Sequence, residues 1–220
     1  FMPTPSDPSG GLDPLHHPKG PIQRAQDNTA RAFGARQSFF VTNGTSTANK
    51  IVAQAMIQPG DIVLVDRDCH KSHHYALVLA GAMPVYLDSY ALPQYSMYGA
   101  VPLAEIERQL LALKDAGKLD RVRMLILTNC TFDGLTYDPE RIMERVLAIK
   151  PDMIFLWDEA WFAFARFSHT LRRRTAMDSA DRLRRMYRSA EYRAAYARRK
   201  EEGSEPAEPM ADPEQVRVRV

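Results

Sequence analysis

The sequence predicts an α/β fold, in which a mostly parallel sheet carries helices on both faces to form three αβα layers. Short runs that are apolar throughout alternate along the chain with longer segments whose apolar side chains recur at helical spacing. Strands that are buried on both faces of a parallel sheet have this continuous apolar character. With 220 residues and a hydrophobic fraction of 45%, the chain has enough apolar material for one substantial core.

The beginning of the chain is expected to lack regular structure. Residues 1–28 are rich in Pro, Gly, Ser and Asp, which indicates an irregular N-terminal arm. We assign residues 29–165 to a large domain, whose first predicted strand lies at residues 38–42. A helix then runs until Pro59 and Gly60 turn the chain, and its apolar positions are Ala48, Ile51, Val52, Ala55 and Met56.

The rest of the large domain continues the same alternation. Four more apolar runs predict strands at residues 62–65, 84–87, 124–127 and 153–157. Residues 71–80 are expected to form a helix that Gly81 closes. Asp138 and Pro139 open another helix, as its N-cap and its first helical residue. A further helix is marked by Leu103, Ile106, Leu110 and Leu111.

Charge is distributed unevenly in the last third of the chain, although the net charge is only +2. Residues 166–200 hold twelve Lys or Arg against three acids, and residues 201–214 hold six acids and no base. We predict an Arg-rich helical insertion and an acidic loop at residues 166–215. Solvated helix faces are the commoner explanation of such a basic stretch, so nucleic acid is not a favoured partner. On the buried face of the insertion we place Leu183, Tyr187 and either Ala190 or Ala194.

The remaining features concern the ends and the compartment. Residues 216–220 alternate between Val and Arg, which indicates the start of a further core strand in a truncated domain, and hence a fragment. No apolar stretch approaches the roughly 20 residues of a membrane span, and the start does not resemble a signal peptide. We therefore expect a cytoplasmic protein. Cys69 and Cys130 are too few for a disulfide framework, so both are expected to be free thiols.

Polar residues follow the predicted strands at the edge where α/β sheets bind ligands. Asp158 comes directly after the apolar run 153–157, where an acid can face a bound cationic group, although many such Asp residues only cap a helix or begin a turn. After the strand at 38–42, Gly44 permits a tight turn. Thr45 or Ser46 can then cap the next helix, and such a helix start suits a phosphate group equally well.

A second strand end places imidazoles near the same edge. His70 and His74 are spaced for one face of a helix, as in some zinc sites. No Glu lies between them and no third ligand is evident, so we predict no metal site. The segment 128–134, another polar turn, follows the strand at 124–127.

One ligand, pyridoxal 5'-phosphate, accounts for these separate features together. Its phosphate suits the helix start near Ser46, and its ring stacks on a flat side chain such as that of His70. Its pyridine nitrogen needs an anion, such as Asp158, to stay protonated and act as an electron sink.

In their residues and their order along the chain, these motifs resemble those of the large domain of the bacterial ornithine/lysine/arginine decarboxylases, a fold-type-I pyridoxal-phosphate family. The resemblance implies that Gly44, Thr45 and Ser46 hold the phosphate, with His70 stacked on the ring and Asp158 paired with the pyridinium, as the two catalytic residues. It further implies that Ala160 packs on the other ring face, that Trp161 lies near the cofactor, and that Thr131 contacts polar ring substituents. The motifs are Leu12-Asp-Pro-Leu-His-His-Pro-Lys-Gly-Pro-Ile22, Phe40-Val-Thr-Asn-Gly-Thr-Ser-Thr-Ala-Asn49, Asp66-Arg-Asp-Cys-His-Lys-Ser72, Thr128-Asn-Cys-Thr-Phe-Asp-Gly134 and Asp158-Glu-Ala-Trp161.

The function implied by this resemblance is decarboxylation of ornithine, lysine or arginine to a diamine or a polyamine precursor, as in polyamine biosynthesis. The family builds its site across a homodimer or higher homo-oligomer. Its Schiff-base lysine lies in a Ser-x-His-Lys stretch that these 220 residues do not contain, and Lys50 and Lys71 belong to other motifs. The chain by itself is therefore expected to be inactive, and its amino-acid substrate stays open.

The sequence is compatible with two other functions. An aminotransferase or lyase of the same fold would share the cofactor contacts, although the His70-Lys-Ser wording favours the decarboxylase. A noncatalytic assembly or nucleic-acid-binding protein would instead use the Arg-rich helix, and its binding would depend on salt.

Overall fold

A computed structural model describes residues 13–202 and 209–220 of the chain. The chain divides into two compact units, residues 1–48 and 49–220. No helix in the described ranges is both long enough and apolar enough to cross a lipid bilayer.

The first unit contains helix α1, Pro21–Phe33. The Asp13 carboxylate accepts hydrogen bonds from the backbone N–H groups of Gly20 (2.7 Å) and Ile22 (3.2 Å), next to Pro21 in the first turn. Gly34 ends the helix in the left-handed conformation, with φ of 75°. The prediction of an irregular arm is therefore wrong from Pro21 onward, because a Pro-rich stretch supplied a helix start rather than a break.

The predicted strand at residues 38–42 is also wrong, since the structure has no strand there. The apolar side chains that suggested it are not buried within their unit: Phe39 is 71% exposed. No backbone hydrogen bond of the segment to a neighbouring strand occurs in the described ranges, and a single run of residues without such a partner does not form a sheet. A side-chain bond holds the segment instead, from Ser38 Oγ to the carbonyl of Gln26 (2.6 Å).

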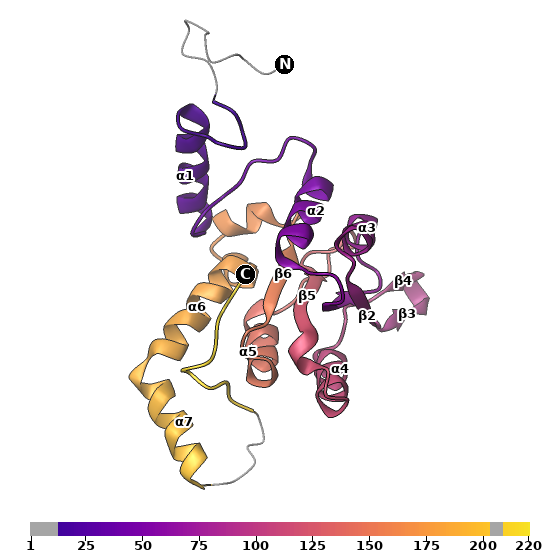
Figure 1. The fold of residues 1–220 in the computed structure, drawn as a ribbon, viewed down its shortest axis with the longest axis vertical. Coiled ribbons are helices and arrows are strands. Elements are labelled where there is room, and N and C mark those ends of the chain that lie inside the picture. The colour runs from indigo at the N-terminus through magenta and orange to yellow at the C-terminus, as the bar shows by residue number, and fades with distance from the viewer. Residues whose placement is uncertain (1–12, 203–208) are drawn as a thin grey trace, which may run out of the picture. The chain divides into compact units, whose positions relative to one another are not determined.

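The second unit is built on a four-stranded parallel sheet with strand order β2-β1-β5-β6 (Figure 1). Its strands are β1 Ile62–Asp66, β2 Met83–Leu87, β5 Val122–Thr128 and β6 Ile154–Asp158. A separate antiparallel pair, β3 Ala91–Leu92 and β4 Met97–Tyr98, follows β2. The predicted strands at residues 62–65, 84–87, 124–127 and 153–157 are thus confirmed.

Helices connect the parallel strands in the predicted alternation. Gly81 closes α3 in the left-handed conformation, and the Asp138 side chain caps α5 by accepting the Arg141 N–H (3.3 Å), both as predicted. Helix α2 begins in the first unit and ends in the second. The helices are α2 Thr45–Met56, α3 Lys71–Ala80, α4 Leu103–Asp115 and α5 Pro139–Ile149, with 3-10 turns at Pro93–Tyr95, Leu119–Arg121, Ala163–Phe167 and Arg172–Arg174.

Two apolar cores cover the two faces of the sheet, because neighbouring side chains in a strand point to opposite faces. On one face, side chains such as Leu64 and Phe155 pack with α4, α5 and α6. On the other, Val65 and Ile154 pack with the second half of α2 and with α3. The predicted α/β class, with a parallel sheet between two layers of helices, is confirmed.

The Arg-rich segment forms two further helices, α6 Ala176–Arg188 and α7 Ala190–Glu202. Leu183 and Tyr187 are buried, as predicted, whereas Ala190 and Ala194 are exposed. Beyond the helices, the chain returns to the edge of the sheet, where Arg219 and Ile154 form a parallel bridge. The six residues 203–208 of the predicted acidic loop lie outside the described residues.

Helix α4 offers a matched test of how much the core contributes. Leu110 is fully buried and its neighbour Leu111 is 45% exposed. We expect Leu110→Ala to lower the free energy of unfolding by roughly 2 to 5 kcal/mol, because it removes buried methyl groups and leaves a cavity. Leu111→Ala should change it by less than about 1 kcal/mol. Urea denaturation of both variants measures the difference, and equal losses would contradict the assignment of faces.

Candidate functional site

Asp158 is the last residue of β6, and its side chain points to the face of the sheet that α2 and α3 cover. Ile154 and Leu156 pack on that face, so the period of two along the strand places Asp158 there too. Thr128, its register partner at the end of β5, has the same orientation. The carboxylate is only 6% exposed, although it belongs to an ionisable residue.

Three donors surround this carboxylate. Nε2 of His73, on α3, lies 2.9 Å from Oδ2 of Asp158, and Nδ2 of Asn49, on α2, lies 3.2 Å from the same oxygen. The other oxygen, Oδ1, accepts the backbone N–H of Ala160 (3.1 Å). His73 and Asn49 are themselves buried, so these contacts are shielded from water.

The balance of these effects keeps Asp158 ionised. Burial alone would raise the pKa of this carboxyl group, because it penalises the charged form. The hydrogen bonds from His73, Ala160 and Asn49, together with the attraction to His73, outweigh burial and lower the pKa below its ordinary value. An ionised carboxylate only accepts hydrogen bonds, so Nε2 of His73 carries a proton and donates it.

A chain of hydrogen bonds joins Asp158 to His70. The Asn49 amide donates one hydrogen to Asp158 and the other to Oγ of Ser72 (3.1 Å). Ser72 Oγ in turn donates to Nδ1 of His70 (2.8 Å), which also accepts the Ser72 N–H (3.2 Å) as the N-cap of α3. The ring of His70 is therefore held through Nδ1, while the residue as a whole is exposed.

Two residues next to Asp158 in the structure, its hydrogen-bond partner His73 and its register partner Thr128, each have a buried polar atom with no hydrogen-bond partner in the described structure. These atoms are Nδ1 of His73 and Oγ1 of Thr128. Buried polar atoms are normally paired, so an unpaired atom on a residue that binds the acid and another on its register partner indicate that a further polar group would complete this region.

The predicted phosphate-binding residues lie at the start of α2, in the first unit. Gly44 has φ of 74°, a conformation that favours glycine. The helix begins at Thr45, so Thr45 and Ser46 are its first helical residues, and the expectation that one of them caps it is wrong. Gly44 occupies the capping position, and its carbonyl accepts the N–H groups of Thr47 (3.1 Å) and Ala48 (3.3 Å).

The other predicted residues lie in the loops after β5 and β6. Thr131 Oγ1 accepts the N–H of Leu135 (3.2 Å) and so belongs to a turn. Ala160 is exposed, and its N–H binds Asp158. Trp161 is 65% exposed and contacts Phe132 edge-on, with 6.0 Å between the ring centres.

Sequence reasoning missed His73 and Asn49, the two side chains that hold the acid. A signal for both is present in the helical spacing. His73 shares the inner face of α3 with Ala76, Leu77 and Ala80, and Asn49 precedes Ala53 by one turn on α2. A polar residue on an otherwise apolar face is a buried polar residue that needs a partner.

No group of three His, Cys, Asp or Glu side chains suited to a metal ion occurs within residues 13–202 and 209–220. His74 contacts Cys69 (Sγ to Nε2, 3.6 Å) and Tyr86 (OH to Nδ1, 3.4 Å) instead. Cys69 and Cys130 are free thiols, as predicted.

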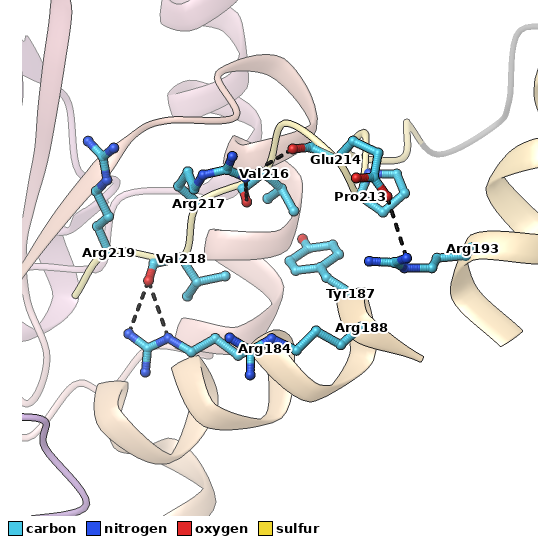
Figure 2. Close-up of a pocket in the computed structure, with 10 residues that line it drawn as sticks. All are labelled: Arg184, Tyr187, Arg188, Arg193, Pro213, Glu214, Val216, Arg217, Val218 and Arg219. Carbon is cyan, nitrogen blue, oxygen red and sulfur yellow. Dashed lines mark hydrogen bonds and ion pairs between the residues drawn. The ribbon is translucent and has the colours of Figure 1, made fainter. Parts of the chain in front are cut away.

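A cavity of about 490 Å³ lies between α6 and residues 213–219 (Figure 2). Its residues Tyr187 and Val216 belong to the core on the face of the sheet opposite to Asp158. Arginines line it, but several already bind the protein itself. Arg184 donates to the Val218 carbonyl (3.0 Å), Arg193 pairs with Glu214 (3.5 Å), and Arg217 donates to the carbonyls of its own segment. We therefore centre the candidate site on Asp158.

The comparisons with known proteins agree on one family. A family model described as Orn/Lys/Arg decarboxylase, major domain, matches residues 6–186 of the chain. Lysine decarboxylase LdcA of Pseudomonas aeruginosa is 42% identical over 154 residues, which cover 67% of this chain and 20% of that protein. The inducible ornithine decarboxylase of Escherichia coli is 35% identical over 151 residues, covering 65% of this chain and 20% of the relative.

A solved structure, lysine decarboxylase A from Pseudomonas aeruginosa, matches with a TM-score of 0.67 at 40% identity. The match covers 79% of this chain and 23% of that one. It confirms the predicted α/β fold of a decarboxylase large domain. The chain spans about a fifth of the length of the two curated relatives.

The contact between His73 and Asp158 predicts a pH-dependent loss of stability. In His73→Ala the carboxylate stays buried without its shortest hydrogen bond, so we expect the pKa of Asp158 to rise and the free energy of unfolding at pH 7 to fall by about 3 kcal/mol. The loss should shrink as the pH falls below the raised pKa of Asp158 in the variant, because the carboxyl group of the variant is then protonated and no longer needs the contact. Carbon-13 NMR titration of Asp158 and urea denaturation measure both effects.

His74→Ala is the matched control for this substitution. His74 is the next residue on α3 but contacts Cys69 and Tyr86 rather than Asp158. An equal rise of the Asp158 pKa in both variants would show that His73 has no special role.

Proposed function

The chain belongs to the Orn/Lys/Arg decarboxylase family, and from that premise we propose that its protein decarboxylates a basic amino acid with pyridoxal 5'-phosphate. The substrate is ornithine, lysine or arginine, and the product is a diamine or a polyamine precursor. The observation that carries the proposal is the buried, ionised Asp158, held by His73 and Asn49 at the carboxyl end of a parallel strand. When bound, the cofactor supplies an electron sink, which accepts the electron pair that remains on the substrate when carbon dioxide leaves.

The hydrogen bonds of Asp158 support its role as the partner of the pyridine nitrogen. A carboxylate has about four positions at which it accepts hydrogen bonds, and three are used by His73, Asn49 and Ala160. The remaining capacity suits one further N–H donor. A lowered pKa keeps the negative charge in place, so Asp158 would stabilise a protonated ring nitrogen by a charge-assisted hydrogen bond.

The anchoring of His70 supports its role as the stacking residue. Ser72 fixes the imidazole through Nδ1, so the ring has a defined orientation at low entropic cost. The exposure of His70 leaves room for a flat ligand against it. Because Ser72 also binds Asn49, one network would orient both the stacking ring and the acid.

The start of α2 supports a role in binding the phosphate. Neither Thr45 nor Ser46 acts as the N-cap, so their hydroxyl groups are not used to close the helix. The first N–H groups of a helix also point out of its N-terminus and attract anions. Asn49, which binds Asp158, lies one turn further along the same helix.

We assign supporting roles to three loop residues. Ala160 would cover the other face of the ring, and the exposed Trp161 would lie near the cofactor. Thr131 is a weaker candidate, because its hydroxyl already accepts the Leu135 N–H. The lysine that binds the cofactor covalently would come from outside these 220 residues. We propose a cytoplasmic homo-oligomer as its setting.

The arginines of the late segment argue against a nucleic-acid-binding function. Arg182 pairs with Glu140 and Asp178, and Arg185 pairs with Asp181 (2.8 Å). Pairs of this kind use the positive charge within the protein, so less of it is available to a phosphate backbone.

Substitution of Asp158 in the full-length protein tests the proposed reaction. We expect Asp158→Ala to lower the rate of carbon dioxide release by at least about a thousandfold, because the ring nitrogen loses its anionic partner. Release from lysine, ornithine and arginine in turn identifies the substrate. Asp152→Asn is the control, since Asp152 lies half-exposed before the same strand and pairs with Lys150. No release from any of the three by the wild-type protein would refute decarboxylation, and an unchanged rate in Asp158→Ala would refute the role of the acid.

The phosphate site is tested by cofactor affinity alone. We expect the double substitution of Thr45 and Ser46 by Ala to raise the Kd for pyridoxal 5'-phosphate by at least about tenfold, because it removes two hydroxyl donors from an anion. The effect on pyridoxal, which lacks the phosphate, should be much smaller. Fluorescence titration with the two compounds measures the difference, and equal losses would place the phosphate elsewhere.

A further inference from the structure

Two neighbouring carboxylates at the end of β6 face opposite sides of the sheet. Asp158 points to α2 and α3, whereas Glu159 points to α6. Oε1 of Glu159 accepts the side-chain amide of Asn129 (2.6 Å) and the backbone N–H of Ala176 (2.8 Å), at the first residue of α6. Glu159 therefore connects the strand that carries the acid with the Arg-rich segment.

Asn129 lies at the centre of this connection and is fully buried. Its backbone N–H donates to the carbonyl of Asp158 (2.9 Å), and its side-chain oxygen accepts the N–H of Tyr137 (3.1 Å). The side-chain amide donates to Glu159 and to the carbonyl of Arg174 (2.9 Å). All three of its N–H hydrogens and its side-chain oxygen are thus used, which leaves the side chain one orientation.

Helix α6 depends on this contact because it lacks a side-chain cap of its own. Thr175 stands at the N-cap position, but its hydroxyl donates to the carbonyl of Arg172 (2.7 Å) instead. The Glu159 carboxylate takes the place of a capping side chain, and a negative group is favourable at a helix N-terminus. The pKa of Glu159 is raised because burial outweighs its two hydrogen bonds, as expected for a group held inside the protein.

The other end of α6 is also tied to β6. Arg184 donates to the carbonyl of Val218, and Figure 2 shows its side chain reaching that oxygen from the helix. One residue further, the carbonyl of Arg219 accepts the N–H of Phe155 in β6 (2.9 Å). Helix α6 therefore contacts Glu159 at the end of the strand that presents Asp158, and residues 218–219 link the helix to the beginning of that strand.

We propose that Asn129 and Glu159 are positioning residues, which lock the main chain at residues 158–159 to the start of α6 and thereby fix the direction of the Asp158 carboxylate. The Arg-rich segment then helps to hold the Asp158 side chain in one position. The importance of that direction for catalysis rests on the function proposed above, but the coupling between α6 and Asp158 does not.

Substitutions of Glu159 test the coupling. Glu159→Ala removes the acceptor for Ala176 and Asn129, whereas Glu159→Gln keeps a carbonyl oxygen in the same place. In the full-length protein, we expect Glu159→Ala to speed amide hydrogen exchange in the first turn of α6 by about tenfold. The Nε2–H proton of His73, which reports the contact with Asp158, should exchange faster by a similar factor. Glu159→Gln should restore both to within about threefold of wild type.

Asp181→Ala is the matched control, because it removes an exposed acid of α6 that pairs with Arg185 rather than with Asn129 or Ala176. If Glu159→Ala speeds exchange in α6 and leaves the His73 proton unchanged, Glu159 is only a helix cap and the proposal is overturned. An unchanged α6 overturns it as well. Asn129→Ala should reproduce both effects, and if that variant does not fold, the two Glu159 variants decide.

The consequence for the cofactor is measured separately. We expect Glu159→Ala to raise the Kd for pyridoxal 5'-phosphate about tenfold and Glu159→Gln to leave it nearly unchanged. If the wild-type protein does not bind this compound, the proposed function fails, and the exchange measurements still decide whether Glu159 positions Asp158.

Discussion

The contact between Asp158 and His73 is the constraint on which the rest of the second unit depends. An ionised carboxylate that is taken out of water without partners costs several kcal/mol, so the fold has to bring donors to it. Those donors come from α2, from α3 and from the loop after β6. Each of these elements must therefore pack in one register against the sheet, and the apolar core on that face provides this packing.

The twofold period of the strand explains how one short sequence serves two purposes. Asp158 faces α2 and α3, and the next residue, Glu159, faces α6. The first acid belongs to the candidate site, and the second joins the strand to the Arg-rich segment. Asn129 binds the main chain of Asp158 and the side chain of Glu159, so the two sides of the sheet meet at one buried amide.

The positive charge of the last third of the chain takes part in the packing of the protein. Its arginines bind acids and carbonyls of the protein, as Arg182 does with Glu140 and Arg184 with Val218. A partly buried ion pair adds little net stability, because removing its two charges from water offsets most of their attraction. Within the described residues, part of the positive charge of the basic segment is therefore already used in contacts inside the protein.

Local patterns in the sequence determined most of the α/β unit. The apolar runs located the parallel strands, Gly81 and Asp138 located helix ends, and the residue types at the strand ends identified Asp158 and the family. These features depend on neighbouring residues, whose propensities and periodicity are present in the sequence itself. Residues 38–42 show the limit of such reasoning, because an apolar run becomes a strand only when another strand is available to pair with it.

Only the tertiary structure decided which side chains hold the acid. Asn49 and His73 lie 109 and 85 positions away from Asp158 along the chain, and nothing local links them. The same holds for the attachment of α6 to Glu159. Such contacts depend on how helices pack across a sheet. That packing determines which donors come within hydrogen-bonding distance of a buried charge.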